Sequence, residues 1–460
     1  MPLSNKLSEL KEIFAKNKEA ILEEYCTFLK FKSISSEENY KQDCLACAEW
    51  ICDYLKKIGF TVELWPTTGH PTIFASYLQA GPDEPILLIY NHYDVQPIDP
   101  IELWNFDPFE PTVSNGEMYA RGAQDNKGQC FYVLLALKIL IELYGGLPIN
   151  IKLCIEGEEE CGSRGLSHLL EQKKEELSAD YLAVVDLSLP NIETPTITLG
   201  LRGIVTMDME VQGSHSDLHS GSHGGLAFNP LHAMVKLLAM THDHSGRVAI
   251  PGFYDDIIPV SENEKKMLAL HFDEEEYKST FGIRPTGGEC KYEPNERNWL
   301  RPTLEVNGIY GGYCGNGFKT VIPAKACAKI SCRLVAGQNP EKIGSLVSEF
   351  LERSAPDGVK VKIVVHPGGG TAVSAKADSR VVKAFSKAYE EIFNKKCQLI
   401  YSGASIPVIT KLAQLSGAQI ALVGLGLPDD QIHAPNEHFG INRIEMGFLS
   451  MARVIELLKN

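Results

Sequence analysis

The sequence places acidic and histidine side chains directly after several short apolar runs. His92 and Asp94 follow the run PILLIY, and the acidic segment 156–160 follows the run NIKLCI. Asp186 follows YLAVV, and His433 comes ten residues after the run AQIALV. Imidazole and carboxylate groups are the ligands that zinc and similar divalent ions take, and the same groups serve as general acids and bases. These positions therefore indicate a site for divalent metal ions as one possibility.

Each of these positions also has an ordinary structural interpretation. His92 and Asp94 stand two residues apart, so on an extended segment the carboxylate points the same way as the imidazole and can orient it; an isolated pair of this kind is more often a surface pair. Asp125 precedes an apolar helical pattern and suits a helix N-cap. The segment 156–160 reads by default as a solvated acidic loop, although crowded carboxylates tolerate one another best around a cation.

The pattern of apolar runs and helices indicates how these residues come together. Fully apolar runs that alternate with amphipathic helices are typical of a parallel sheet covered on both faces. The same pattern of an apolar run and a helix occurs again near the end of the chain. Open sheets of this kind bind ligands outside the carboxyl ends of their strands, where the acidic and histidine positions fall. Expected strands are 85–90, 150–155, 181–185 and 418–423, and expected helices are 125–144, 163–174 and 443–458.

The middle of the chain has a different pattern. From Gly203 polar and apolar residues alternate, as they do again over 324–335, which predicts antiparallel strands with one solvated face. Helices are expected at 230–241 and 340–353, and the stretch 250–302 is expected to form loops without a core of its own. The predicted fold is an α/β doubly wound catalytic domain made of residues 1–202 and 375–460, with an inserted α+β domain over 203–374.

Length and composition set the broader class. The chain has 460 residues, enough for at least two packed units. Its net charge of −15 disfavours nucleic acid and anionic membranes as partners. No apolar leader is visible in the first 14 residues, and the 12 cysteines follow no regular spacing, which predicts reduced thiols and a cytoplasmic protein.

Taken in order, several motifs resemble those of the M20 metallopeptidases, most closely the branch of cytosolic non-specific dipeptidases related to carnosinase. The motifs are HYDVQP, RGAQDNKG, EGEEECGS and SDLHSG, together with Asp186 and His433. The match extends over nearly the whole chain and is specific in order and spacing. The resemblance implies a peptidase with two divalent metal ions per subunit, with zinc expected and manganese or cobalt as alternatives.

The same resemblance implies roles for individual residues. Glu159 would be the general base, and Asp94 would orient His92. Two metal ions lower the pKa of a water and polarise a substrate carbonyl, and imidazole and carboxylate are suitable ligands for them. The implied ligands of one ion are His92, Asp125 and Asp186, and those of the other are Asp125, Glu160 and His433.

In similar proteins the inserted domain acts as a lid and pairs two subunits, so a homodimer is expected. His219 in the lid motif would reach the partner subunit's active site and stabilise the oxyanion. Arg333 would bind the terminal carboxylate of the substrate as a planar fork, which lysine does less well. Further substrate contacts are expected from Asn316, Thr320, Gly403 and Ser405, with His366 as a weaker candidate.

The chain departs from the family pattern at two places. Close relatives carry Arg-Glu-Gly-Gly-Ser-Ile-Pro where this chain has Tyr-Ser-Gly-Ala-Ser-Ile-Pro, so Ser402 replaces the glutamate that would face a free amino group. Cys161 follows Glu160 where a small residue is usual, and a packed bystander is favoured over a thiolate ligand. Cleavage of dipeptides or small peptides is the leading hypothesis. The alternatives are hydrolysis of N-acylated amino acids and a metal-binding scaffold without turnover.

Overall fold

The computed structural model describes residues 3–269 and 271–459, which divide into two compact units. Unit 1 comprises Met1–Leu199, Ala375–Ile400 and Lys411–Asn460, and unit 2 comprises Gly200–Ser374 and Tyr401–Thr410. The sequence prediction had assigned 401–410 to the first domain. This segment clusters with unit 2 because Gly403 accepts a hydrogen bond from Arg202 (3.1 Å), and Thr410 donates one to the Thr371 carbonyl (2.8 Å).

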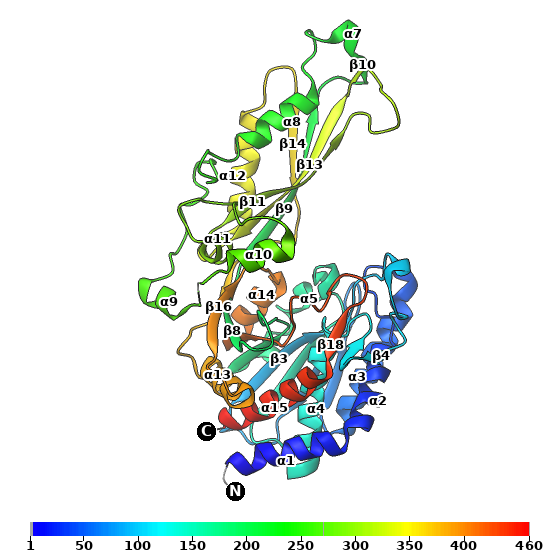
Figure 1. Ribbon diagram of the computed structural model, residues 1–460, viewed down its shortest axis with the longest axis vertical. Coiled ribbons are helices and arrows are strands. Elements are labelled where there is room, and N and C mark those ends of the chain that lie inside the picture. The colour runs from blue at the N-terminus through cyan, green and yellow to red at the C-terminus, as the bar shows by residue number, and fades with distance from the viewer. Residues whose placement is uncertain (1–2, 270, 460) are drawn as a thin grey trace. The chain divides into compact units, whose positions relative to one another are not determined.

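Unit 1 is built on a large mixed sheet (Figure 1). Four of its strands, β6, β3, β7 and β17, run parallel to one another, and their residues are almost entirely buried, as the apolar runs predict. β1, β2 and β8 join antiparallel at the edges. The order is β1 (Thr61–Trp65), β2 (Thr72–Tyr77), β6 (Asn150–Glu156), β3 (Ile86–His92), β7 (Tyr181–Val185), β17 (Gln419–Val423) and β8 (Thr196–Leu201). The α/β fold class is confirmed.

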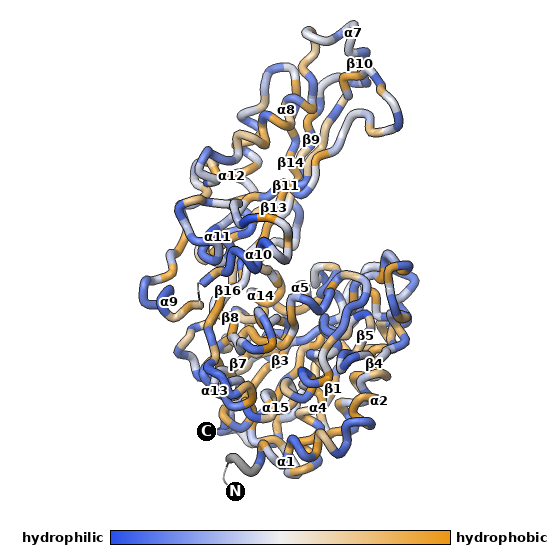
Figure 2. Tube along the Cα trace, viewed as in Figure 1, coloured by the Kyte–Doolittle hydropathy of each residue, from blue (hydrophilic) through white to orange (hydrophobic). Residues whose placement is uncertain are grey.

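The helices of unit 1 pack against this sheet and against one another. α4 (Lys127–Tyr144) contacts β3 and α15 (Ile441–Leu457), and α13 (Arg380–Phe393) contacts β17 and α15. α4 is buried over most of its length, whereas α1 shows both hydrophilic and hydrophobic colours in Figure 2. The helix expected over 163–174 is shorter, ending at Leu169. The other helices are α1 (Leu3–Lys16), α2 (Lys18–Leu29), α3 (Lys41–Lys57), α5 (Arg164–Leu169), α6 (Lys174–Leu177) and α14 (Pro407–Ser416), the last crossing into unit 2.

A small sheet brings the end of unit 1 beside its beginning. β18 (His438–Gly440) pairs antiparallel with β5 (Glu117–Tyr119), which pairs with β4 (Thr112–Ser114). His433 and Asp125 stand just outside these strands in sequence. The pairing therefore holds two segments side by side that are more than 300 residues apart in the sequence.

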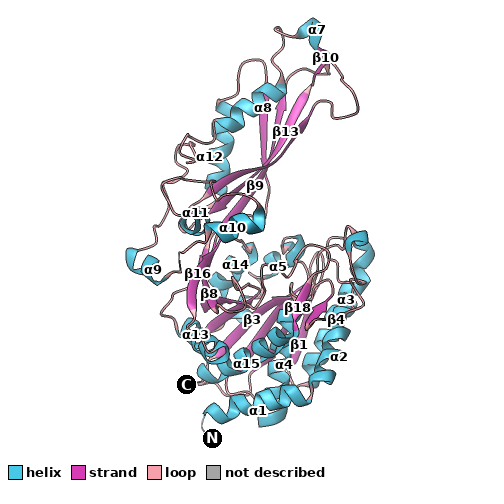
Figure 3. Cartoon of the chain, in the orientation of Figure 1, coloured by secondary structure: helices cyan, strands magenta, loops and turns pink. Residues whose placement is uncertain are grey.

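Unit 2 contains an antiparallel sheet, whose strands are magenta in Figure 3. The strand order is β11, β13, β9, β14. Residues of β9 alternate between buried and partly exposed, and the buried face packs against α8 and α12. The stretch expected to be irregular contains the short helices α9, α10 and α11. The bounds are β9 (Gly203–Gln212), β11 (Thr303–Gly311), β13 (Lys325–Leu334), β14 (Lys360–Val365), α8 (Pro230–Ala239), α9 (Glu262–Met267), α10 (Glu274–Phe281), α11 (Pro294–Leu300) and α12 (Pro340–Arg353).

Shorter elements complete unit 2. β10 (Leu218–His219) pairs with β12 (Val321–Ile322) and leads into α7 (Ser220–His223). β15 (Val373–Ser374) and β16 (Gln398–Ser402) both pair with β8. Within the described residues, no helix is long and apolar enough to cross a membrane.

Candidate metal centre

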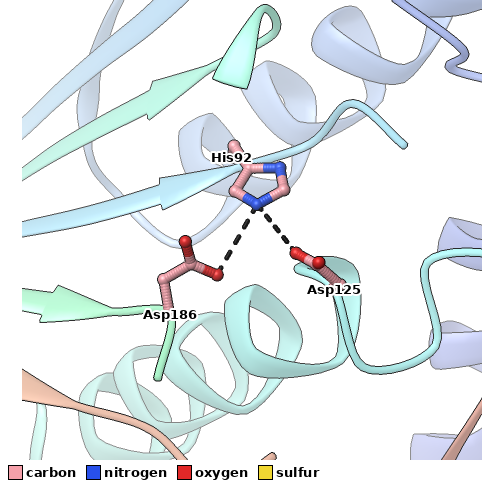
Figure 4. Close-up of side chains that lie close together, drawn as sticks. All are labelled: His92, Asp125 and Asp186. Atoms are coloured by element: carbon pink, nitrogen blue, oxygen red, sulfur yellow. Dashed lines mark hydrogen bonds and ion pairs between the residues drawn. The ribbon is translucent and has the colours of Figure 1, made fainter. Parts of the chain in front are cut away.

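The first group of possible ligands surrounds the imidazole of His92, the last residue of β3. Its Nε2 lies 3.1 Å from Oδ1 of Asp125 and 3.5 Å from Oδ1 of Asp186, and the ring is fully buried (Figure 4). Asp186 directly follows β7, and Asp125 lies in the loop before α4. The three residues offer ligand atoms within 4.8 Å of one another. One nitrogen and two oxygens at this spacing suit a zinc-like ion.

The second group shares Asp125 with the first. Oδ2 of Asp125 lies 3.1 Å from Nε2 of His433, and the same nitrogen lies 3.3 Å from Oε2 of Glu160. These atoms again lie within 4.8 Å of one another. Because Asp125 presents Oδ1 to one group and Oδ2 to the other, its carboxylate is placed to bridge two ions.

The orientation of the His92 ring is set through its other nitrogen. Nδ1 lies 3.1 Å from the main-chain carbonyl oxygen of Asp94 and 3.4 Å from its carboxylate Oδ1. A proton held at Nδ1 by these acceptors leaves the lone pair of Nε2 directed at Asp125 and Asp186. Burial lowers the pKa of His92, but the charge of Asp186 and the hydrogen bonds of the neighbouring carboxylates raise it well above its usual value.

The carboxylate of Asp94 holds the acidic loop as well as the histidine. It accepts hydrogen bonds from the main-chain N–H groups of Glu159 (3.2 Å) and Glu160 (3.0 Å) and from the hydroxyl of Ser35 (2.6 Å). Asp94 is fully buried. The sequence predicted an orienting role toward His92 only. In the structure Asp94 fixes the backbone of both glutamates, and Ser35 in turn fixes Asp94.

The two glutamates of this loop differ in their surroundings. Glu160 accepts a hydrogen bond from Nε2 of Gln96 (2.7 Å) and belongs to the second ligand group, whereas Glu159 belongs to neither group. Burial, with the charge of Asp125 next, raises the pKa of Glu160 to about 7. Burial also raises the pKa of Glu159 well above its usual range, aided by the charges of Asp186 and Glu160. Crowded, buried carboxylates of this kind fit a site made for cations.

The loop that carries Asp125 is held by a buried glutamate. Glu437 is 1% exposed, and its Oε1 accepts hydrogen bonds from the main-chain N–H groups of Gln124 and Asp125, both at 3.0 Å. Its Oε2 accepts from the N–H of Gly122 and from Nη1 of Arg121, both at 2.8 Å. Glu437 therefore connects the loop of Asp125 to its own loop, which also carries His433.

The loop of His433 takes a backbone conformation that few side chains favour. Gln431, His433 and Asn436 all have positive φ, between 58° and 67°. Buried Asp430 holds the loop at its start through a two-pronged ion pair with Arg443, at 2.6 and 2.7 Å. Neither this pair nor Glu437 was singled out from the sequence, although Glu437 stands only four residues after the predicted ligand.

The residues predicted to bind substrate all lie in unit 2, away from the ligand groups in sequence. His219 is exposed in β10, and its Nδ1 accepts from the N–H of Gly221 (3.0 Å). His366 pairs with Asp208 (3.2 Å) at the surface, and Ser405 donates to the carbonyl of Gly203 (3.1 Å). The carbonyl of Asn316 accepts from Tyr313, the carbonyl of Thr320 accepts from the N–H of Ser220, and Arg333 lines a cavity with Arg202.

The fold and the two ligand groups together describe an α/β protein with a candidate dinuclear metal centre. Residues 88–457 match the family model described as peptidase family M20/M25/M40, and the chain belongs to this family. It is 33% identical to the human "Beta-Ala-His dipeptidase", covering 89% of this chain and 84% of that protein. It is 30% identical to the "Cys-Gly metallodipeptidase DUG1" of Candida albicans, covering 96% and 93%.

A solved structure of a peptidase from the same family is similar to this chain in fold and in sequence. The "M20 family metallo-carboxypeptidase Sso-CP2 from Sulfolobus solfataricus" superposes with a TM-score of 0.86 at 32% identity, covering 95% of this chain and 99% of that one. The resemblance drawn from the motifs is therefore confirmed at the level of the family. The chain is a metallopeptidase of the M20 type.

Proposed function

We propose that this protein hydrolyses the amide bond of dipeptides or other small peptides with the help of two divalent metal ions. The observation that carries the proposal is the position of Asp125, whose two carboxylate oxygens face two separate groups of ligand atoms. Glu159 belongs to neither group, yet the charges of ligands from both groups, Asp186 and Glu160, act on its carboxylate. A protein that only bound metal would have no need for such a base.

The donor set fits zinc, with manganese and cobalt as alternatives. His92, Asp125 and Asp186 would hold one ion, and Asp125, Glu160 and His433 the other. When bound, such ions lower the pKa of a water molecule and polarise the carbonyl of the scissile amide. Each group offers three protein ligands, which leaves coordination positions for water and substrate.

The carboxylate of Glu159 would move the proton. It takes a proton from the attacking water as the oxygen bonds to the amide carbon, and it delivers that proton to the leaving nitrogen as the carbon–nitrogen bond breaks. Its raised pKa favours the first step, since a carboxylate with a raised pKa accepts a proton more readily than an ordinary one. Asp94 keeps Glu159 in place through the main-chain N–H.

Binding of substrate would fall to unit 2. Arg333 would bind the terminal carboxylate with help from Asn316, Thr320, His366 and the Gly403–Ser405 loop. His219 would stabilise the oxyanion in the active site of a partner subunit, so the proposal includes a homodimer. It also includes a cytoplasmic location. The names of two relatives, "Beta-Ala-His dipeptidase" and "Cys-Gly metallodipeptidase", support dipeptides as the substrate class.

One observation favours a second candidate substrate. Ser402 stands where relatives of this branch have a glutamate for the free amino group, and its hydroxyl accepts a hydrogen bond from the N–H of Ala404 (3.1 Å). Ser402 carries no charge to attract an ammonium group. Substrates acylated at nitrogen, such as N-acetyl amino acids, are therefore the alternative.

The test compares a free dipeptide with its N-acetyl derivative on zinc-loaded enzyme. The proposal expects the free dipeptide to be the better substrate by kcat/KM. Faster cleavage of the acetylated form would favour the alternative. Absence of turnover on both, with two ions bound per chain, would leave a metal-binding scaffold and overturn the proposal.

A further inference from the structure

Unit 2 contains a cavity of about 420 Å³ with an excess of positive charge. Three arginines, Arg202, Arg297 and Arg333, line it, and the one carboxylate in its wall is that of Glu305, which is exposed. The formal charge of the lining is thus three positive against one negative. A cavity of this size is large enough for an amino-acid residue.

Among the described residues, the guanidinium groups of Arg202 and Arg297 donate hydrogen bonds only to neutral acceptors. Arg202 donates to the carbonyls of Gly403 (3.1 Å) and Arg301 (3.4 Å) and to Oδ1 of Asn298 (3.3 Å). Arg297 donates to two loop carbonyls through its Nη atoms, while its buried Nε has no hydrogen-bond partner.

Arg333 is half-buried in the same cavity wall. Within the part of the chain that the structure describes, neither its side chain nor that of Arg202 or Arg297 forms an ion pair. Burial, followed by repulsion from Arg333, lowers the pKa of Arg202 to about 10. Three like charges that share one exposed carboxylate, that of Glu305, are costly to bury, and an anionic ligand lowers that cost.

The neighbouring Arg301 shows what a structural arginine looks like in the same region. Its Nε donates to Oε1 of Glu289 at 2.6 Å, and its guanidinium lies over the rings of Tyr254 and Tyr292. Its charge is neutralised inside the protein. The three cavity arginines lack such a partner, which distinguishes a binding surface from a packing contact.

We propose that this cavity selects substrates whose carboxyl-terminal residue is aspartate or glutamate, with Arg202 and Arg297 receiving the side-chain carboxylate. This inference rests on the proposed function, in which Arg333 and the Gly403–Ser405 loop take the terminal carboxylate. Arg202 bonds directly to Gly403 of that loop, so a second carboxylate of the same residue would meet it. Two carboxylates match the net charge of the lining, and each fits the planar fork of a guanidinium.

The wall also offers apolar surface for the carbon chain of such a residue. The rings of Phe272 and Tyr277 line the cavity and pack against each other with centroids 5.3 Å apart. A methylene chain would lie against the rings while its carboxylate reaches the arginines.

The experiment measures kcat/KM for the isosteric dipeptides Ala-Glu and Ala-Gln on zinc-loaded enzyme. The wild type is expected to prefer Ala-Glu by about 10-fold or more, mainly through KM, because one charge-assisted pair separates the substrates. Arg202→Gln is expected to bring the ratio close to one, and Arg202→Lys, which keeps the charge and loses the fork, to leave an intermediate ratio. Since partial unfolding lowers both rates equally, the ratio does not depend on the folded fraction.

Exposed Arg353 on α12 provides the matched control, and Arg353→Gln should keep the wild-type ratio. Cleavage of both dipeptides at equal kcat/KM would overturn the cavity proposal and leave the proposed function standing. A preference for Ala-phosphoserine over Ala-Glu would also overturn it. Lack of cleavage of every dipeptide would instead overturn the proposed function.

A binding measurement tests the cavity without turnover. Titration calorimetry with L-glutamate and L-glutamine compares ligands that share the amino and carboxyl groups able to contact a metal. Tighter binding of glutamate by wild type, reduced in Arg202→Gln, supports the cavity. Equal binding of the two overturns it.

Discussion

The metal centre of unit 1 and the arginine cavity of unit 2 carry opposite excesses of charge. In unit 1, Asp125, Asp186, Glu159 and Glu160 crowd around two imidazoles, and burial raises the pKa of three of these carboxyl groups. In unit 2, three guanidiniums line a cavity that offers them a single carboxylate. Structural charges in the same chain are neutralised, as in the Asp430–Arg443 pair. Uncompensated charge of one sign therefore marks where a ligand of the other sign belongs.

The largest effect is expected from removing the shared carboxylate. Asp125→Ala should lower kcat/KM by about 1,000-fold or more, because the ions supply several kcal/mol of transition-state stabilisation. Metal analysis should show fewer than two zinc ions per chain. Full activity with two ions retained would contradict a bridging role for Asp125.

Glu159 is expected to give the next largest effect. Glu159→Gln keeps the size of the side chain and removes the base, so kcat should fall at least ~100-fold while two ions remain bound. Steady-state kinetics and metal analysis of the same preparation decide the matter. Turnover close to wild type would show that another group moves the proton.

Glu437 tests whether the surrounding hydrogen bonds matter as much as the ligands. Glu437→Gln places an N–H₂ group against N–H donors of the Asp125 loop, so zinc affinity should weaken about 10- to 100-fold. Competition with a chromogenic chelator measures the affinity. Glu391→Gln, which breaks a partly buried ion pair with Arg453, is the control and should bind zinc like wild type.

The smallest effect concerns pH. In the metal-free protein the pKa of Glu160 is raised to about 7 and that of His433 to about 10. Both groups hold protons more tightly folded than unfolded, so they favour folding at low pH, and this contribution falls as pH rises through these values. Metal-free protein should therefore show a Tm a few degrees higher at pH 5 than at pH 8.

Zinc should reverse this trend, because it displaces the same protons and binds more tightly at pH 8. Scanning calorimetry with and without zinc at both pH values measures it. A metal-free Tm that rises from pH 5 to pH 8 would contradict the assigned shifts for these two groups.

The sequence gives a clearer signal for the candidate metal ligands than for the residues that hold them in place by hydrogen bonds. His92 ends one buried parallel strand, and Asp186 and Glu160 follow two others. That regular position made them candidates, and the family resemblance supplied their expected roles as ligands. Ser35 and Glu437 hold the same site from loops whose apolar pattern carries no signal. A lone polar residue in a loop has no spacing that distinguishes a buried hydrogen-bond acceptor from a solvated one.

The boundary between the units was harder to predict for a similar reason. Residues 401–410 lie between a strand and a helix pattern assigned to the catalytic domain, yet hydrogen bonds to Arg202, Gly203 and Thr371 join them to unit 2. Arg202 itself stands at the start of the inserted segment and belongs to no motif. Arg202 became a candidate binding residue because it forms no ion pair among the described residues, and a sequence does not reveal which ion pairs form.

The central claim is that Asp125 joins two metal ions. A crystal structure of the zinc-loaded protein, with anomalous data at the zinc edge, tests it most directly. Two peaks about 3.5–4 Å apart, each within bonding distance of one oxygen of Asp125, are the expected result. A single peak, or two peaks of which Asp125 touches only one, would contradict it.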